Sequence, residues 1–121
     1  MDEITRLQAE VLRVIAHPVR LEILHLLALG PLDVGAIATH IGASQPNISQ
    51  HLAVLRSAGL VEYERHGREI RYGLVDPDVV TACAVMQGVL RRRLERLAGL
   101  AASAGASHSD PRAAFRLLAH S

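Results

Sequence analysis

Four polar side chains lie close together near the middle of the 121-residue chain, and all can hydrogen-bond to nucleic-acid bases: Gln45, Asn47, Ser49 and Gln50. Asparagine and glutamine can bond the edge of adenine through two hydrogen bonds, and serine can bond a base or a phosphate. A solvated, capped helix surface is the alternative interpretation. We prefer it only for Ser44, whose hydroxyl suits the N-cap of a helix. The other four residues together predict a helix end that recognises bases.

Arginine supplies the second candidate chemistry, because all 13 basic residues are arginine and none is lysine. A planar guanidinium pairs well with phosphates and with guanine edges. We expect Arg56 to contact a phosphate and Arg68 to contact the DNA backbone or the minor groove. Residues 44–74 carry four arginines against three glutamates, a net charge of +1. This small charge predicts modest affinity for DNA and a strong dependence on salt.

The spacing of apolar residues predicts the helices that must position these groups, because such residues recur every three or four positions. The expected helices cover residues 2–15, 18–29, 33–40, 44–56 and 76–102. The expected buried face of the second helix consists of Leu21, Leu24, Leu27 and Ala28. Pro18 and Pro46 suit the first turns of helices, whereas Gly42 and Gly59 suit helix ends. Two helices joined by a tight turn at Gly42 are typical of a helix-turn-helix.

A β-hairpin is expected after the fourth helix, because two runs of residues alternate in character. Val61 and Tyr63 alternate with glutamates, and Ile70 and Tyr72 belong to a second run of this kind. The dipeptide His-Gly at 66–67 supplies the turn between two strands of about six residues each. A helix-turn-helix followed directly by a hairpin is a winged helix. The predicted fold class is therefore mainly α with a small β-hairpin, in a winged helix-turn-helix arrangement.

The first and last long helices each carry an apolar stripe that a small winged domain cannot cover. The stripes consist of Ile4, Leu7 and Val11 on the first helix and Cys83, Leu90 and Leu94 on the last. Pairing with a second copy is the simplest way to bury both, so we expect a homodimer with these residues at its interface. We assign residues 1–102 to one DNA-binding and dimerisation domain. Residues 103–121 are expected to form a flexible tail that could contain a short helix.

Composition and motifs exclude several function classes. A single cysteine excludes an internal disulfide and a multi-cysteine zinc ribbon within one chain. The sequence has neither a long apolar run nor a signal-peptide pattern, which predicts a cytoplasmic protein without a membrane partner. We expect no enzyme activity, because no phosphate-binding loop, nucleophile motif or carboxylate pair indicates catalysis. Cys83 fits a small buried residue better than a thiol sensor.

Two stretches of the sequence resemble a known family of bacterial transcriptional regulators, the ArsR/SmtB family. Its recognition helix and wing are similar to SQPNISQHLAVLRSAGLVEYERHGREIRYGL, and its second and third helices are similar to HPVRLEILHLLALGPLDVGAIATHIG. The resemblance implies a homodimeric repressor that binds a palindromic DNA operator and leaves it when a signal arrives. Members of the family commonly carry two consecutive histidines where this chain has Gln50 and His51. We expect His51 to face the protein rather than the DNA.

Metal sensing is the best-known activity in that family, but this chain lacks two of the family's ligand sets. One family site would place its distal ligands at Val89 and Arg92, neither of which can bind a cation. Another uses cysteines near the third helix, where residues 32–35 contain none. No cofactor is therefore assigned and the metal ligands are unknown. Zinc or nickel held by histidines in another arrangement remains an alternative, as does a winged-helix module that binds protein instead of DNA.

Overall fold

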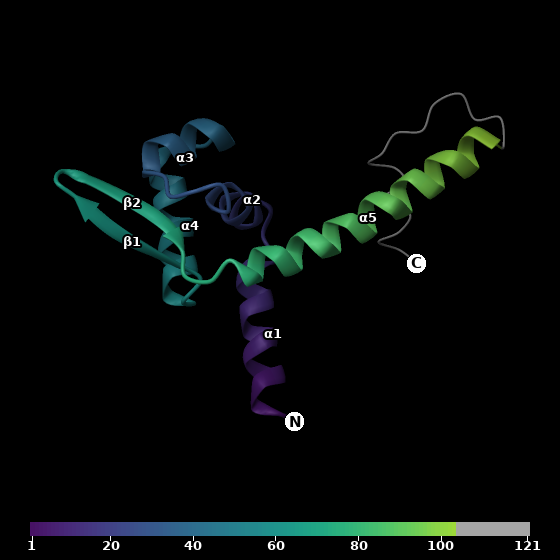
Figure 1. Ribbon diagram of the computed structural model, residues 1–121, viewed down its shortest axis with the longest axis horizontal. Coiled ribbons are helices and arrows are strands. Elements are labelled where there is room, and N and C mark those ends of the chain that lie inside the picture. Colours follow the sequence, from purple (N-terminus) through teal and green to yellow (C-terminus); the bar gives the residue numbers. More distant parts are fainter. Residues whose placement is uncertain (104–121) are drawn as a thin grey trace. The chain divides into compact units, whose positions relative to one another are not determined.

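The computed structural model describes residues 1–103, which form five helices and one antiparallel hairpin (Figure 1). The elements are α1 (Glu3–Ile15), α2 (Pro18–Leu27), α3 (Val34–Ile41), α4 (Gln45–Ser57), β1 (Val61–His66), β2 (Glu69–Leu74) and α5 (Asp78–Ser103). The order confirms the predicted winged helix-turn-helix. The expected tail lies outside the described residues, except that Ser103 ends α5.

Local signals in the sequence begin and end most of these helices. The Asp33 carboxylate accepts a hydrogen bond from the Ala36 N–H at 2.7 Å, and the Ser44 hydroxyl oxygen accepts one from the Asn47 N–H at 3.3 Å. Ser44 is therefore the N-cap of α4, as predicted. Gly42 ends α3 with φ +79°, a left-handed conformation that favours glycine.

The helix α2 ends at Leu27, two residues before the predicted end. Ala28 is consequently exposed instead of buried, and Leu21 is only half-buried. Ile23, which the periodicity did not select, is fully buried in their place. Leu27 is the last buried residue of the helix, and residues 28–29 form an exposed turn that leads out of it.

The core of residues 1–80 lies between α2, α3, α4 and the start of the hairpin. Its fully buried residues include Ile23, Ile37, Ile48, Leu52 and Leu55, each with a relative exposure of 0%. Three of these five come from α4. Because burying one such side chain contributes about 1.5–3 kcal/mol, the inner face of α4 is firmly held.

The hairpin pairs Val61 with Leu74 at its base and His66 with Glu69 at its end. The turn therefore consists of residues 67–68, one position later than predicted, because His66 still pairs within the strand. Leu32, in the connection between α2 and α3, exchanges two backbone hydrogen bonds with Tyr72, at 3.0 and 2.8 Å. This bridge attaches β2 to the helical part of the domain.

The chain divides into two compact units, and most of α5 belongs to the second, which begins at Thr81. Within this unit the predicted stripe residues Cys83, Leu90 and Leu94 are half-buried. Several other large apolar side chains on the helix are exposed, among them Val85 at 65% and Met86 at 57%. None of the helices in residues 1–103 is long and apolar enough to cross a membrane.

Candidate nucleic-acid interface

The second helix of the helix-turn-helix, α4, presents different chemistry on its inner and outer sides. Ile48, Leu52 and Leu55 anchor the inner side in the core. The four predicted base-contacting residues are all exposed and lie in its first two turns: Gln45, Asn47, Ser49 and Gln50. A helix that reads a major groove needs this arrangement, with polar groups near its N-terminus and a fixed opposite face.

Most of these polar side chains have donors and acceptors that are not used in hydrogen bonds within the described residues. Within residues 1–103, the side chains of Asn47, Ser49 and Gln50 make no hydrogen bond. Gln45 leans toward α3, because its amide nitrogen lies 3.4 Å from the position that a Cβ on Gly35 would take. The structure thus brings the four predicted residues to one end of α4.

His51 lies on the same helix but faces α2, as expected. Its ring centroid lies 4.5 Å from that of His17, and its Nδ1 accepts a hydrogen bond from the Arg20 Nε at 3.3 Å. Arg20 also donates to the carbonyl oxygen of Val14 at 2.9 Å. Burial lowers the pKa of His51, and electrostatic repulsion by the neighbouring His17 and Arg20 lowers it further. A neutral His51 therefore braces α4 against α2.

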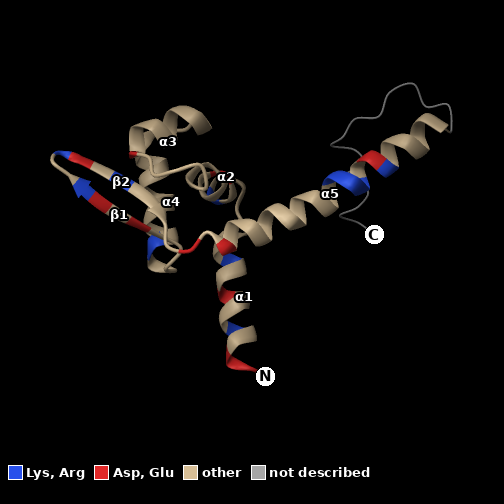
Figure 2. Cartoon of the chain, in the orientation of Figure 1, with Lys and Arg blue, Asp and Glu red and all other residues tan. Residues whose placement is uncertain are grey.

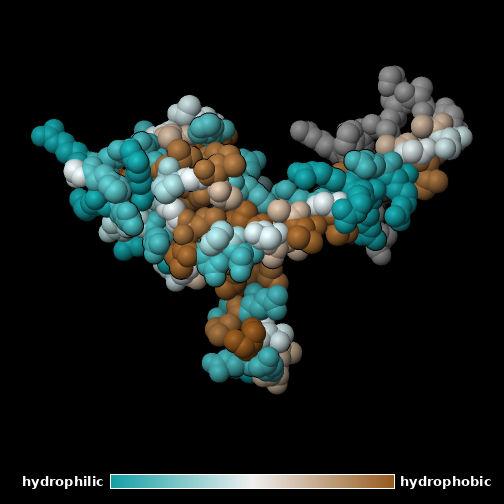
Figure 3. All heavy atoms as spheres, viewed as in Figure 1, coloured by the Kyte–Doolittle hydropathy of each residue, from teal (hydrophilic) through white to brown (hydrophobic). Residues whose placement is uncertain are grey.

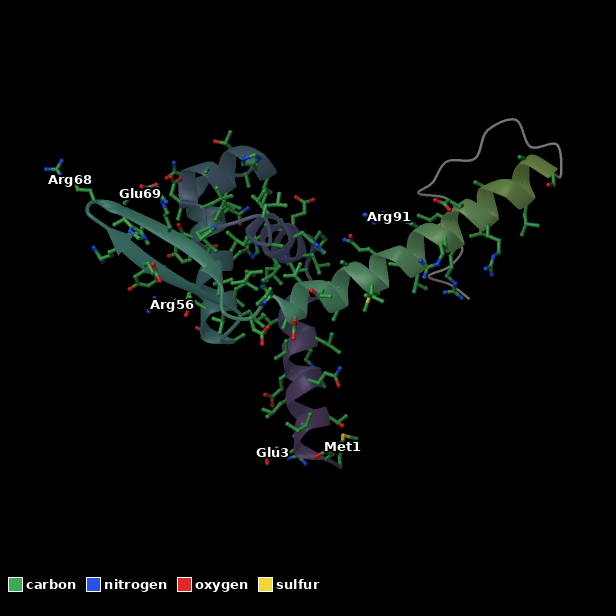
Figure 4. All side chains as sticks on the ribbon, viewed as in Figure 1. Met1, Glu3, Arg56, Arg68, Glu69 and Arg91 are labelled. Carbon is green, nitrogen blue, oxygen red and sulfur yellow. The ribbon has the colours of Figure 1, made fainter. Side chains whose placement is uncertain are left out.

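A cation–π contact connects α4 to the wing. The guanidinium carbon of Arg56 lies 4.3 Å from the centroid of the Tyr63 ring on β1. Tyr63 in turn lies 5.7 Å from its cross-strand partner Tyr72. Figure 4 shows Arg56 beside the base of the hairpin. Stacking uses the face of the guanidinium and leaves its N–H edges available to an acceptor.

The positive charge of the wing is concentrated at its tip. Arg68 extends beyond the turn (Figure 4), and neither it nor Arg65 forms an ion pair among the described residues. Arg71, by contrast, is paired with Glu69 at 3.2 Å. Acidic residues alternate along β1 behind the tip, at Glu62 and Glu64 (Figure 2). Contact with a phosphate backbone would therefore involve the tip rather than the length of the hairpin.

Two side-chain contacts that hold this surface in place were not predicted from the sequence. Arg20 reaches His51 across 31 residues, and no sequence pattern connects them. The position of Tyr63 in the hairpin was predicted, but its contact with Arg56 was not, because that contact depends on how the hairpin packs against α4.

The described residues include no group of three or more histidine, cysteine, aspartate or glutamate side chains placed to hold a metal ion. The Asp76 carboxylate accepts a hydrogen bond from the Asp78 N–H at 2.9 Å, so it serves the start of α5. His17 is likewise occupied, because its Nδ1 accepts from the Val19 N–H at 3.2 Å. His108 and His120 lie outside the described residues.

The chain has a helix-turn-helix with an attached wing, and the exposed polar side chains at the start of its second helix are mostly free to bind a ligand. These features define a winged helix-turn-helix regulator. Comparison with known proteins agrees. The sequence model of a protein family, described as bacterial regulatory protein, arsR family, matches residues 17–63 of this chain. The HTH-type transcriptional regulator Rv0081 of Mycobacterium tuberculosis is 39% identical over 90 residues, which cover 74% of this chain and 79% of that protein. The chain belongs to the arsR family of bacterial transcriptional regulators.

Solved structures of similar proteins share the fold. The crystal structure of Rv0081 has a TM-score of 0.70 at 35% identity, covering 81% of this chain and 99% of that one. The homodimeric winged helix-turn-helix DNA-binding domain Mb0332 of Mycobacterium bovis has a TM-score of 0.69 at 38% identity, covering 77% and 86%. The transcriptional repressor BigR of Xylella fastidiosa has a TM-score of 0.65 at 34% identity, covering 69% and 86%.

Proposed function

We propose that this protein is a homodimeric repressor that binds a palindromic operator in double-stranded DNA and is released by a signal. The observation that carries the proposal is the exposed polar end of α4. The inner face of this helix is fully buried, and most of the polar side chains at its exposed end make no hydrogen bond within the described residues. The similar Mb0332 is a homodimeric DNA-binding domain, and BigR is a repressor. Both support the same activity here. Binding to DNA would place the protein in the cytoplasm.

In the proposed complex the N-terminal half of α4 enters the major groove. Asn47 and Gln50 bond base edges, and Gln45 and Ser49 bond a base or a phosphate. Arg68 contacts the backbone or the minor groove from the wing tip. Arg56 contacts a phosphate through an N–H edge while its face stays on Tyr63. The two copies of α4 meet successive major grooves about 10 base pairs apart or a multiple of that spacing.

The proposed dimer buries the stripes on α1 and α5. Ile4 and Leu7 are 69% and 48% exposed, respectively, which is high for large apolar side chains. Val11 is half-buried, as are the stripe residues of α5. A charged residue at Leu94 on α5 would have to be buried without a partner in such a dimer.

Titration of DNA binding with salt tests the proposal against the alternative of a protein-interaction module. The ligand is a duplex containing an imperfect palindrome from the DNA that flanks the gene, and the control is a scrambled duplex of the same length. A repressor that contacts phosphates binds the palindrome more tightly and loses affinity as salt rises. Equal, weak binding to both duplexes would favour the protein-interaction module.

A further inference from the structure

A cluster of three basic side chains, His17, Arg20 and His51, connects α2 to the proposed recognition helix α4. His17 is the N-cap of α2, Arg20 lies in the first turn of that helix, and His51 directly follows Gln50 on α4. We propose that protonation of His51 weakens operator binding, so that a fall in pH is a signal that releases the protein from DNA. This proposal rests on the proposed repressor function and assigns a chemical signal to it.

The hydrogen bond between Arg20 and His51 requires a neutral imidazole. The Arg20 Nε–H donates to the Nδ1 of His51 at 3.3 Å, so Nδ1 carries a lone pair and the proton of the neutral ring is on Nε2. A second proton on the ring would occupy Nδ1 and place two N–H donors against each other. Arginine cannot relieve this conflict, because its guanidinium stays protonated at any pH at which the protein is folded. Protonation of His51 therefore breaks the bond.

The surroundings of His51 oppose its protonation. The ring of His17 lies 4.5 Å from that of His51, measured between centroids, and both rings are half-buried. Burial lowers the pKa of His51 most, and repulsion by His17 and Arg20 lowers it further. A proton that does bind to His51 therefore strains the contact between α2 and α4.

No carboxylate offsets this repulsion. The acidic side chains on the elements that pack against α4 are Glu3 and Glu10 on α1, Glu22 on α2, and Glu62 and Glu64 on β1. The helix α3 contributes one ionisable group, the exposed His40. Within residues 1–103, none of these groups forms an ion pair or a hydrogen bond with His51. A protonated His51 would thus carry its charge without an anionic partner.

Loss of this bond reaches the base-contacting residues through a single helix. His51 adjoins Gln50 and lies about one helical turn after Asn47. Arg20 also donates to the carbonyl oxygen of Val14 at 2.9 Å, so the intact contact fixes α4 relative to both α1 and α2. Good hydrogen bonds span donor–acceptor distances of only about 2.7–3.2 Å. A small rotation of α4 is therefore enough to weaken the contacts of Asn47 and Gln50 with bases.

The expected direction of the pH effect is opposite to that of ordinary electrostatics. Exposed histidines that gain a proton add positive charge, which strengthens binding to phosphates. His66 is such a residue on the wing, whose visible surface is mostly hydrophilic (Figure 3), and its Nε2 lies 3.4 Å from a carboxylate oxygen of Glu64. Operator affinity that falls as the pH is lowered is instead the behaviour expected from His51.

Linkage sets the size of the effect. If DNA binds the form with a neutral His51, each imidazole lowers affinity by up to about tenfold per pH unit below its pKa. A dimer contains two such residues, so the limit is about 100-fold per pH unit. Because the pKa of His51 lies below its usual value of about 6.5, the loss should begin in mildly acidic solution.

Fluorescence anisotropy with the palindromic and scrambled duplexes, between about pH 7.5 and about pH 5.0, tests the proposal. The wild-type protein should lose affinity for the palindrome by about tenfold or more and should keep or gain affinity for the scrambled duplex. His51→Gln still offers an amide oxygen to Arg20 but cannot be protonated, so its affinity for the palindrome should not fall. The matched control is His40→Gln, because His40 is exposed and makes no hydrogen bond within residues 1–103; it should retain the wild-type loss. Circular dichroism at each pH checks that the protein is folded.

Nuclear magnetic resonance titration of the His51 ring in the wild-type protein provides a measurement that needs no substitution. Because linkage is reciprocal, the palindromic duplex should lower the pKa of His51 further, whereas the negative charge of DNA alone would raise it. A pKa that the palindrome leaves unchanged or raises would contradict the proposal.

The remaining outcomes separate this proposal from the repressor function on which it rests. Wild-type affinity for the palindrome that stays constant or rises as the pH falls, or an equal loss in His51→Gln, would overturn the pH signal and leave the repressor intact. A protein that does not prefer the palindrome even at about pH 7.5 would overturn the proposed repressor, and the signal with it.

Discussion

Replacing Asn47 with alanine, and separately Gln50 with alanine, should weaken operator binding without weakening the fold. Each well-placed side chain contributes about 1–3 kcal/mol of discrimination between base pairs. A dimer makes each contact twice, so the expected loss is about 2–6 kcal/mol, or at least about 30-fold in affinity. Both side chains are exposed and make no hydrogen bond within residues 1–103, and alanine is a strong helix former. The free energy of unfolding should therefore be almost unchanged.

Fluorescence anisotropy on two labelled duplexes, the operator and a scrambled sequence of equal length, measures the effect. Both alanine variants should lose affinity for the operator and keep wild-type affinity for the scrambled duplex. Arg68→Ala is the control, because a backbone contact carries no sequence information. It should weaken binding to both duplexes alike.

Unchanged operator affinity in both Asn47→Ala and Gln50→Ala would show that α4 does not read bases through these residues. An equal loss on operator and scrambled DNA would also contradict the assignment, since it would make them phosphate contacts. In either case the Arg68→Ala result would still report whether the wing contacts the backbone.

Three further results are expected. Leu94→Glu should shift the protein toward the monomer by light scattering, because its charge would be buried unpaired; an unaltered dimer would remove α5 from the interface. The lowered pKa of His51 means that the folded state binds its proton more weakly than the unfolded state, so stability should fall as pH drops below about 6.5. Urea unfolding should show a weaker pH dependence in His51→Gln, and an identical one would contradict this role. Protein stripped of metal should remain dimeric and bind its operator; calorimetric zinc or nickel binding that is tight and is lost in Asp78→Ala would reveal a metal site on α5.

The helix-turn-helix could be predicted closely because its signals are local. A serine cap before Pro46 and left-handed glycines at Gly42 and Gly59 determine where α3 and α4 begin or end within one turn of the chain. The alternation in the hairpin is equally local. Such features depend on backbone geometry that a few neighbouring residues decide.

Prediction failed where tertiary packing decides. The helical spacing of α2 was compatible with burial of Ala28, but the chain leaves the core at Leu27 and buries Ile23 instead. The brace between Arg20 and His51 has the same origin, because it requires α2 to lie against α4. The sequence identified the side chains that could contact DNA, whereas only the structure revealed what holds them.

The arrangement of charges on the wing and at the C-terminal end of α4 also predicts how steeply the affinity for DNA should depend on salt. Arg71 is neutralised by Glu69, so Arg56, Arg65 and Arg68 are left to contact phosphates, six in the dimer. At about 0.9 per neutralised phosphate, the log–log slope of affinity against salt should be near −5. Arg56→Ala should make the slope shallower by about 1.8, whereas Arg71→Ala should hardly change it. A slope that Arg56→Ala leaves untouched would show that Tyr63 holds this guanidinium away from the DNA, and the contact of Arg56 with Tyr63 would then serve only to fasten the wing to α4.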